Sequence, residues 1–118
     1  MTLFRAIPLA IHGVVEVIAA PVLIAAPFVL GFGHAAGAAS IALGAMLMWL
    51  ALSTHGEHRT ISLAAHAALD YLIGAVAVAS AVALAVAGAP LVATAFLAGF
   101  GATHMLLTAS TRFSIRGA

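Results

Sequence analysis

The 118-residue sequence has no cysteine and no lysine, and four arginines and three acidic residues are its only charged side chains besides histidine. Without cysteine, neither a disulfide framework nor a thiolate metal site can form. A formal net charge of +1 gives no basic surface for a phosphate backbone, so we expect no nucleic-acid partner.

The apolar content decides the class of protein. Hydrophobic residues make up 65% of the chain, charged residues 6%, and the mean hydropathy is +1.26. A soluble domain carries about 25% charged residues, and a fold of this length has too little interior to hide so much apolar surface. The sequence therefore predicts an integral membrane protein in contact with the lipid bilayer, with residues 1–118 as one transmembrane domain.

Four apolar windows are long enough to cross a bilayer, which takes about 20 residues as a helix. They cover about residues 7–30, 38–53, 61–86 and 91–109. Pro8 suits the first turn of a helix, whereas Pro21 and Pro27 should bend or end it. Glycine-rich turns at 31–37 and 88–90, a polar loop at 54–60 and a polar tail at 110–118 separate or follow the windows. We expect an all-α bundle of four transmembrane helices.

The arginines predict the orientation of this bundle. Arg5 precedes the first window, Arg59 lies between the second and third, and Arg112 and Arg116 follow the fourth. With four spans these segments share one side of the membrane, and the positive-inside rule assigns that side to the cytoplasm. Both termini are thus expected to be cytoplasmic. The use of arginine alone and the abundance of alanine are typical of a bacterial gene of high GC content, which indicates a bacterial inner (plasma) membrane.

The two halves of the chain resemble each other at a spacing of 54 residues. Segment 7–12 aligns with 61–66, which pairs His12 with His66 and Glu16 with Asp70. Repeat 1 covers about 5–58 and repeat 2 about 59–112. Because each repeat is a two-helix hairpin, both enter the membrane in the same direction. The predicted relation is a parallel repeat about an axis along the membrane normal.

A short motif late in the first window points to a known family. Segment 26–32 reads Ala-Pro-Phe-Val-Leu-Gly-Phe and resembles the Ser-Pro-Trp motif of the SPW-repeat small integral membrane proteins. In that family the motif lies in the first helix of a two-helix unit of about this length. Here Ala26 and Phe28 replace the family's Ser and Trp, and the second copy reads Ser-Ala-Val at 80–82. The resemblance implies a membrane location and two-helix units, and it implies no activity.

Each repeat places a histidine and a carboxylate four residues apart, on one face of a helix. His12 and His66 each follow an arginine by seven residues, and His104 precedes Arg112 by eight. At 1.5 Å of rise per residue, all three lie about 10 Å inside the cytoplasmic boundary. We therefore expect one buried layer that contains His12, Glu16, His66, Asp70 and His104.

Several interpretations of this layer stand side by side. It is interhelical glue if its groups only hydrogen-bond across helices. It is a metal site if His12, Glu16, His66, Asp70 and His104 supply ligands, because imidazole and carboxylate suit divalent first-row ions. His12, His66 and His104 are also candidate cofactor-binding residues, with His12 and His66 as axial haem ligands. A proton relay is the remaining alternative.

No motif supports catalysis. A Ser-His-Asp order with supporting sequence is lacking, and little of the chain lies outside the membrane to hold a substrate. We expect a non-enzymatic protein that acts by helix–helix association with itself or with other membrane proteins, favoured by its many small residues. A metal-, haem- or proton-binding protein is the alternative. His34, His55 and His58 lie in predicted loops and are expected to be solvated.

Overall fold

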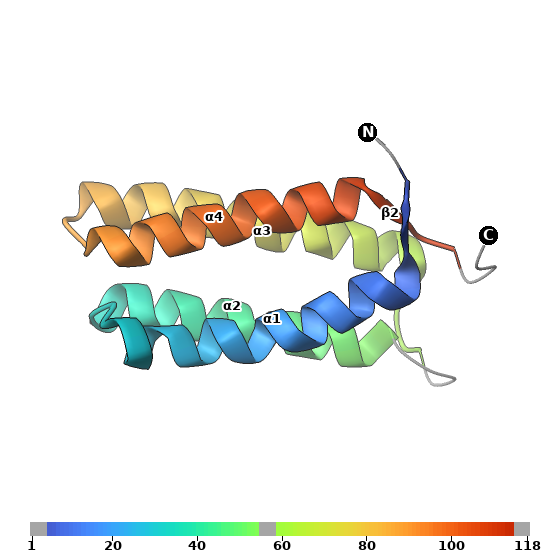
Figure 1. Ribbon diagram of the computed structural model, residues 1–118, viewed down its shortest axis with the longest axis horizontal. Coiled ribbons are helices and arrows are strands. Elements are labelled where there is room, and N and C mark those ends of the chain that lie inside the picture. The colour runs from blue at the N-terminus through green and yellow to red at the C-terminus, as the bar shows by residue number, and fades with distance from the viewer. Residues whose placement is uncertain (1–4, 55–58, 115–118) are drawn as a thin grey trace.

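The computed structural model describes residues 5–54 and 59–114 as four long helices and two short strands (Figure 1). The helices are α1 (Leu9–Leu30), α2 (His34–Thr54), α3 (Leu63–Val86) and α4 (Leu91–Ala109). Each is long and apolar enough to cross a membrane. This confirms the predicted all-helical fold with four helices that could each span a membrane. His55, His58 and Arg116 lie outside the described residues.

The helices pack as two hairpins, α1 with α2 and α3 with α4. Glycines let the backbones approach closely within each hairpin. A Cβ atom added to Gly44 would lie 2.8 Å from the carbonyl oxygen of Ala20, and one added to Gly101 would lie 2.6 Å from that of Gly74. The Ser40 hydroxyl also donates to the Leu23 carbonyl across the first hairpin, at 2.6 Å. Small residues thus serve contacts inside this chain.

The two hairpins meet over an apolar core and are joined mainly through α2 and α3, with fewer contacts between α1 and α4. The middle of the bundle is filled by buried leucine, isoleucine and alanine side chains, the larger of which are Leu23, Leu43, Leu47, Leu50, Ile73 and Leu97. A second apolar cluster lies at the end with the short turns and contains Ala26, Phe32, Ala36 and Ala93.

The first and last described segments pair as two strands beside the opposite end of the bundle. Strand β1 (Ile7–Pro8) runs parallel to β2 (Thr111–Arg112), with Ile7 opposite Thr111, and the Ile7 amide donates to the Ser110 carbonyl at 3.0 Å. The sequence had predicted a helical start at residue 7 and a plain polar tail after residue 110. Both predictions are corrected here: Pro8 is the N-cap residue of α1, and the tail returns to the start of the chain.

The other helix boundaries differ from prediction mainly at α2. Residues 34–37 belong to α2 and not to a turn, because only Gly31 and Gly33 in this stretch need a positive φ. The Gly37 amide already donates to the Gly33 carbonyl. Helix α1 continues through Pro21 and ends three residues after Pro27, whose carbonyl accepts the Gly31 and Phe32 amides.

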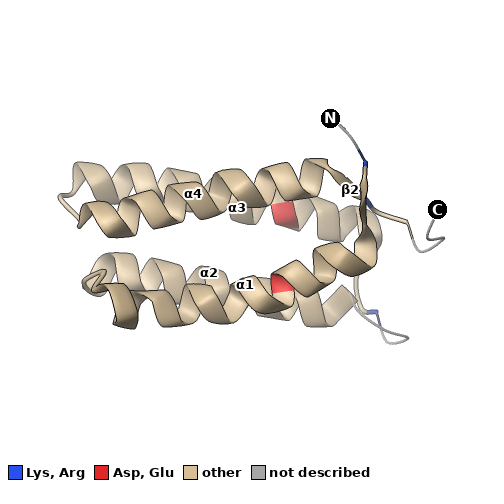
Figure 2. Cartoon of the chain, in the orientation of Figure 1, with Lys and Arg blue, Asp and Glu red and all other residues tan. Residues whose placement is uncertain are grey.

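Charged side chains are segregated along the long axis (Figure 2). Arg5, Arg59 and Arg112 all lie at the end that also holds the β1–β2 pair, outside the helices. The two described carboxylates, Glu16 and Asp70, lie within α1 and α3. The described arginines therefore share one end of the bundle, as the sequence predicted.

Candidate functional site: a buried histidine–carboxylate cluster

All five side chains of the predicted polar layer meet in the interior, between the arginine end and the middle of the bundle. His12 and Glu16 project from α1, His66 and Asp70 from α3, and His104 from α4. None is more than 4% exposed. The i,i+4 spacing places both members of each pair on the inward face of a helix, so each hairpin contributes one histidine–carboxylate pair to a common cluster.

Asp70 is the centre of this cluster. Its Oδ2 atom lies 2.9 Å from Nε2 of His12 and 3.0 Å from Nε2 of His66, and its Oδ1 atom lies 3.1 Å from Nε2 of His104. One carboxylate thus contacts three imidazoles from three helices. Such a group is costly to bury unless these contacts are kept.

Glu16 faces the same two histidines from the opposite hairpin. Its Oε1 atom lies 2.8 Å from Nε2 of His12 and 3.3 Å from Nε2 of His66. Its Oε2 atom is buried and has no hydrogen-bond partner among the residues that the structure describes. The cluster therefore contains a buried oxygen without a hydrogen bond. Such atoms are rare in native proteins and often mark the place of a water molecule or an ion.

Two threonines fix the outer side of the histidines, and sequence analysis did not identify them as part of the site. Nδ1 of His12 lies 2.8 Å from the Thr111 hydroxyl oxygen, and Nδ1 of His66 contacts that of Thr54. Each hydroxyl has a single hydrogen, which it donates to a backbone carbonyl four residues earlier: Thr111 to Leu107 and Thr54 to Leu50. The threonine oxygens must therefore accept, so each Nδ1 carries a hydrogen.

This assignment determines what the histidines present to the carboxylates. A neutral imidazole with its hydrogen on Nδ1 has a lone pair on Nε2. Both Nε2 atoms face carboxylate oxygens, which also present lone pairs. Four electron-rich atoms then face one another in a buried volume, and only positive charge between them makes the arrangement favourable. That charge is either a metal ion or protons shared between the Nε2 atoms and the carboxylate oxygens.

The four atoms have a spacing suited to a tetrahedral ion. Ligand atoms of His12, Glu16, His66 and Asp70 all lie within 4.8 Å of one another, and the four nitrogen–oxygen distances among them are 2.8–3.3 Å. A tetrahedral ion with bonds of about 2.0–2.1 Å separates its ligand atoms by about 3.3 Å. A few tenths of an ångström of opening would admit it.

Aromatic rings enclose the cluster. Phe113, which follows β2, contacts the rings of His12 and His66 with centroid distances of 5.2 and 5.8 Å. Phe100 stacks on His104 at 5.3 Å with an interplanar angle of 17°. Phe113 lay in the predicted polar tail, where no helical spacing could connect it with residue 12. His34 is exposed at the other end of the bundle, in the first turn of α2.

Comparisons of the chain with protein-family models, with curated proteins and with solved structures give no match. The SPW-repeat resemblance therefore stays a prediction.

Proposed function

We propose that this chain is a multi-pass integral membrane protein whose histidine–carboxylate cluster holds one divalent first-row metal ion, such as Zn²⁺ or Fe²⁺. The ligand atoms are Nε2 of His12, Nε2 of His66, Oε1 of Glu16 and Oδ2 of Asp70. One observation carries the proposal: these four atoms converge while both Nδ1 atoms are engaged by threonine oxygens. Metal-binding histidines characteristically donate their other ring hydrogen to such an outer partner.

Charge balance supports an ion at this place. Two ionised carboxylates with two neutral imidazoles carry a charge of −2 in a fully buried volume, which a divalent cation neutralises. An isolated aspartate at mid-membrane costs about 2.5–3.5 kcal/mol on the insertion scale. Neutralising both carboxylates at once removes most of that penalty.

The ligand count favours a structural role. Four protein ligands complete a tetrahedral shell, and closed shells are typical of structural metal sites, whereas catalytic sites keep an open position. Phe113 also covers the two histidine rings. We therefore propose a non-enzymatic protein in which the ion ties α1 to α3, and hence one hairpin to the other. His104, which contacts the second oxygen of Asp70, positions that carboxylate from outside the ligand set.

The geometry favours this function over the haem and proton alternatives. Nε2 of His12 and of His66 are directed at Glu16 and Asp70 and do not face each other across a flat gap, so a porphyrin has no place between them. Two protons would balance the charge as a metal does, but they would leave Oε2 of Glu16 unpartnered. A metal bound by Oε1 brings a positive charge within reach of that second oxygen.

We also propose that the arginine end faces the bacterial cytoplasm and that the hairpins are repeats of one unit, as in SPW-repeat proteins. The positive-inside rule supports the orientation, and a reporter fused after residue 118 tests it: a periplasmic signal would refute it. The equivalent surroundings of His12 and His66, each between a threonine and the same two carboxylates, support the repeat. Association with other copies or other membrane proteins stays a prediction.

Elemental analysis of the protein, purified in mild detergent without added chelator, tests the metal proposal. We expect about one first-row ion per chain. We expect His12→Ala and His66→Ala to lose it, because each removes a ligand. His34→Ala is the matched control, since this histidine is exposed and far from the cluster.

Titration with Co²⁺ provides a second measurement. Tetrahedral coordination by two nitrogens and two oxygens is expected to give visible absorption bands, which Zn²⁺ should displace. Protein that is purified without metal, and that binds neither ion, would overturn the proposal and leave two shared protons as the explanation of the cluster. Equal metal loss in the His34 variant would likewise overturn it.

A further inference from the structure

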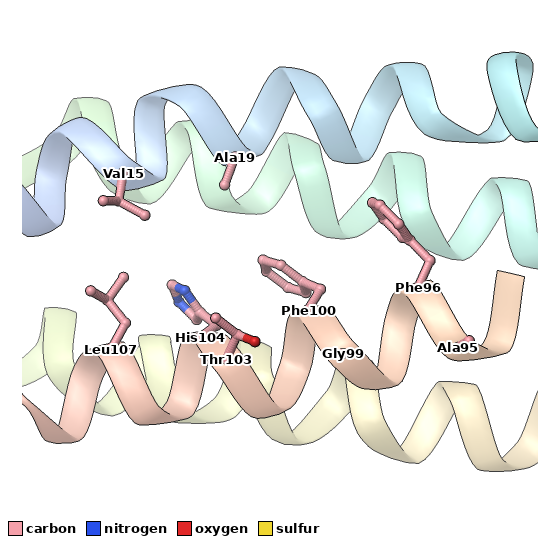
Figure 3. A pocket seen from close by; sticks show the side chains of 9 residues that line it. All are labelled: Val15, Ala19, Ala95, Phe96, Gly99, Phe100, Thr103, His104 and Leu107. Carbon is pink, nitrogen blue, oxygen red and sulfur yellow. The ribbon is translucent and has the colours of Figure 1, made fainter. Parts of the chain in front are cut away.

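A groove of about 460 Å³ lies on the bundle surface between α1 and α4, two helices that make few contacts with each other. Figure 3 shows Val15 and Ala19 of α1 directed toward α4, with Phe96, Phe100 and His104 of α4 on the opposite side. In a membrane this groove opens toward lipid. Its size falls in the range of about 300–1,000 Å³ that is typical of small-molecule sites.

Two polar groups interrupt its apolar lining. Thr103 is exposed, and its hydroxyl has no hydrogen-bond partner in the described part of the chain. His104 is 4% exposed and contacts Oδ1 of Asp70 through Nε2. Its second nitrogen, Nδ1, makes no hydrogen bond with any described residue. In a lipid-facing groove with no water, both groups would remain unsatisfied at a cost.

The bond to Asp70 determines what His104 offers a ligand. An ionised carboxylate can only accept, so Nε2 of His104 carries the hydrogen. In the neutral ring Nδ1 is then an acceptor. A ligand that satisfies it must donate a hydrogen from a hydroxyl or an amine, and the hydroxyl of Thr103 beside it can both donate and accept.

We propose that the groove binds a lipid-soluble phenol, a class that includes hydroquinones, with its hydroxyl donating to Nδ1 of His104. The aromatic ring would lie against Phe96 and Phe100, whose faces and edges favour another aromatic ring. Its alkyl substituent would extend into the bilayer. A plain acyl chain fills the same apolar space but leaves Nδ1 and the Thr103 hydroxyl unpaired.

Gly99 lines this groove and has no side chain to fill it. A Cβ atom added there meets no atom within 4 Å, so the helix leaves open space at the ring's expected position. This site uses none of the four proposed metal ligands, so a phenol can be tested with or without a bound ion. Because His104 contacts Asp70, a bound phenol and a bound ion would still influence each other's affinity.

Photolabelling of the full chain in lipid nanodiscs tests the proposal. The probe is a 4-alkylphenol with a diazirine in its alkyl chain, and mass spectrometry maps the labelled residues. We expect labelling of α1 and α4 around the groove. Unlabelled 4-nonylphenol should compete at least tenfold better than 4-nonylanisole, its methyl ether, which has the same ring and alkyl chain but a methyl group in place of the hydroxyl hydrogen.

Three variants define the site. Gly99→Leu should abolish the competed labelling because its side chain starts in open space and extends into the groove. Ala102→Leu adds bulk to an exposed position outside the groove and should leave labelling unchanged. Thr103→Val should weaken phenol competition several-fold.

Equal competition by the phenol and the anisole, or by a plain alkane, would show a site for acyl chains and overturn the proposal. So would labelling that Gly99→Leu does not reduce.

Discussion

The two ends of this bundle join the same two hairpins by opposite chemistry. At the arginine end, α1 meets α3 and α4 through five buried ionisable side chains and a pair of strands. At the other end, Phe32, after α1, lies against Phe96 of α4 with a centroid distance of 5.4 Å, beside buried alanines. The helix α1 that links them has 22 residues, or about 33 Å.

The hairpin contacts at the two ends differ in whether their stability depends on charge balance. Apolar packing at the Phe32 end depends on shape alone. The cluster at the arginine end stabilises the bundle only while its charges are balanced, because one buried charge without a partner costs more than the intact set contributes. The packing of one hairpin against the other therefore depends on a metal ion or protons at the arginine end, but not at the Phe32 end.

The largest effect is expected from Asp70→Ala, which removes the partner of three histidines. Breaking a buried pair from one side costs about 3–5 kcal/mol. Unfolding of the purified protein in mixed micelles by increasing SDS measures this loss. As the contrast, joint replacement of His12, Glu16, His66 and Asp70 by apolar residues of similar volume should keep the bundle and lose the metal. If this fourfold variant were as unstable as Asp70→Ala, the cluster would stabilise the bundle more than apolar side chains in the same place do.

The next effect concerns the apolar end. Phe32→Ala should lower the free energy of unfolding by about 3 kcal/mol, the lower part of the range for a buried phenylalanine. Metal affinity should not change, because the two ends are too far apart to couple. A metal titration of this variant checks the point. Altered affinity would show that the two ends of the bundle are energetically coupled.

The smallest effect is expected from the threonines that hold Nδ1 of the two histidines. Thr111→Val and Thr54→Val keep side-chain shape but remove the hydrogen-bond acceptor, and loss of such an outer partner weakens metal binding about 10–100-fold. Thr94→Val is the matched control. The Thr94 hydroxyl also donates to a backbone carbonyl, that of Leu91, but at the other end of α4. Competition with a metallochromic chelator measures the affinities, and equal values for Thr111→Val and Thr94→Val would contradict the assigned role.

The sequence predicted what depends on local period and composition. Apolar windows located all four helices, and the fourth matched from Leu91 to Ala109. The i,i+4 spacing and the distance from each arginine predicted that His12, Glu16, His66, Asp70 and His104 would meet. Both signals work because a helix has a fixed rise and repeat, and because buried ionisable groups need partners.

What the sequence did not predict depends on contacts between distant segments. Thr111 reaches His12 across 99 residues, through a strand pair that no local pattern indicates. Thr54 was expected at the start of the polar loop, but it is the last residue of α2 and lies beside His66. The start of α2 was misplaced because glycines near residue 33 suggested a longer turn than the backbone required.

The pairing of β1 with β2 has a consequence for biogenesis. Helix α1 is synthesised before α3 and β2, so it forms at a time when Asp70, His66 and Thr111 have not been made. Until α3 is made, Glu16 and His12 have only each other as partners. The mean hydropathy of 2.2 over an 18-residue window of α1 favours membrane insertion despite these two polar groups. Strand β2 is synthesised after all four helices and brings Thr111 beside His12, so a chain truncated before β2 would expose an incomplete cluster to membrane quality-control proteases.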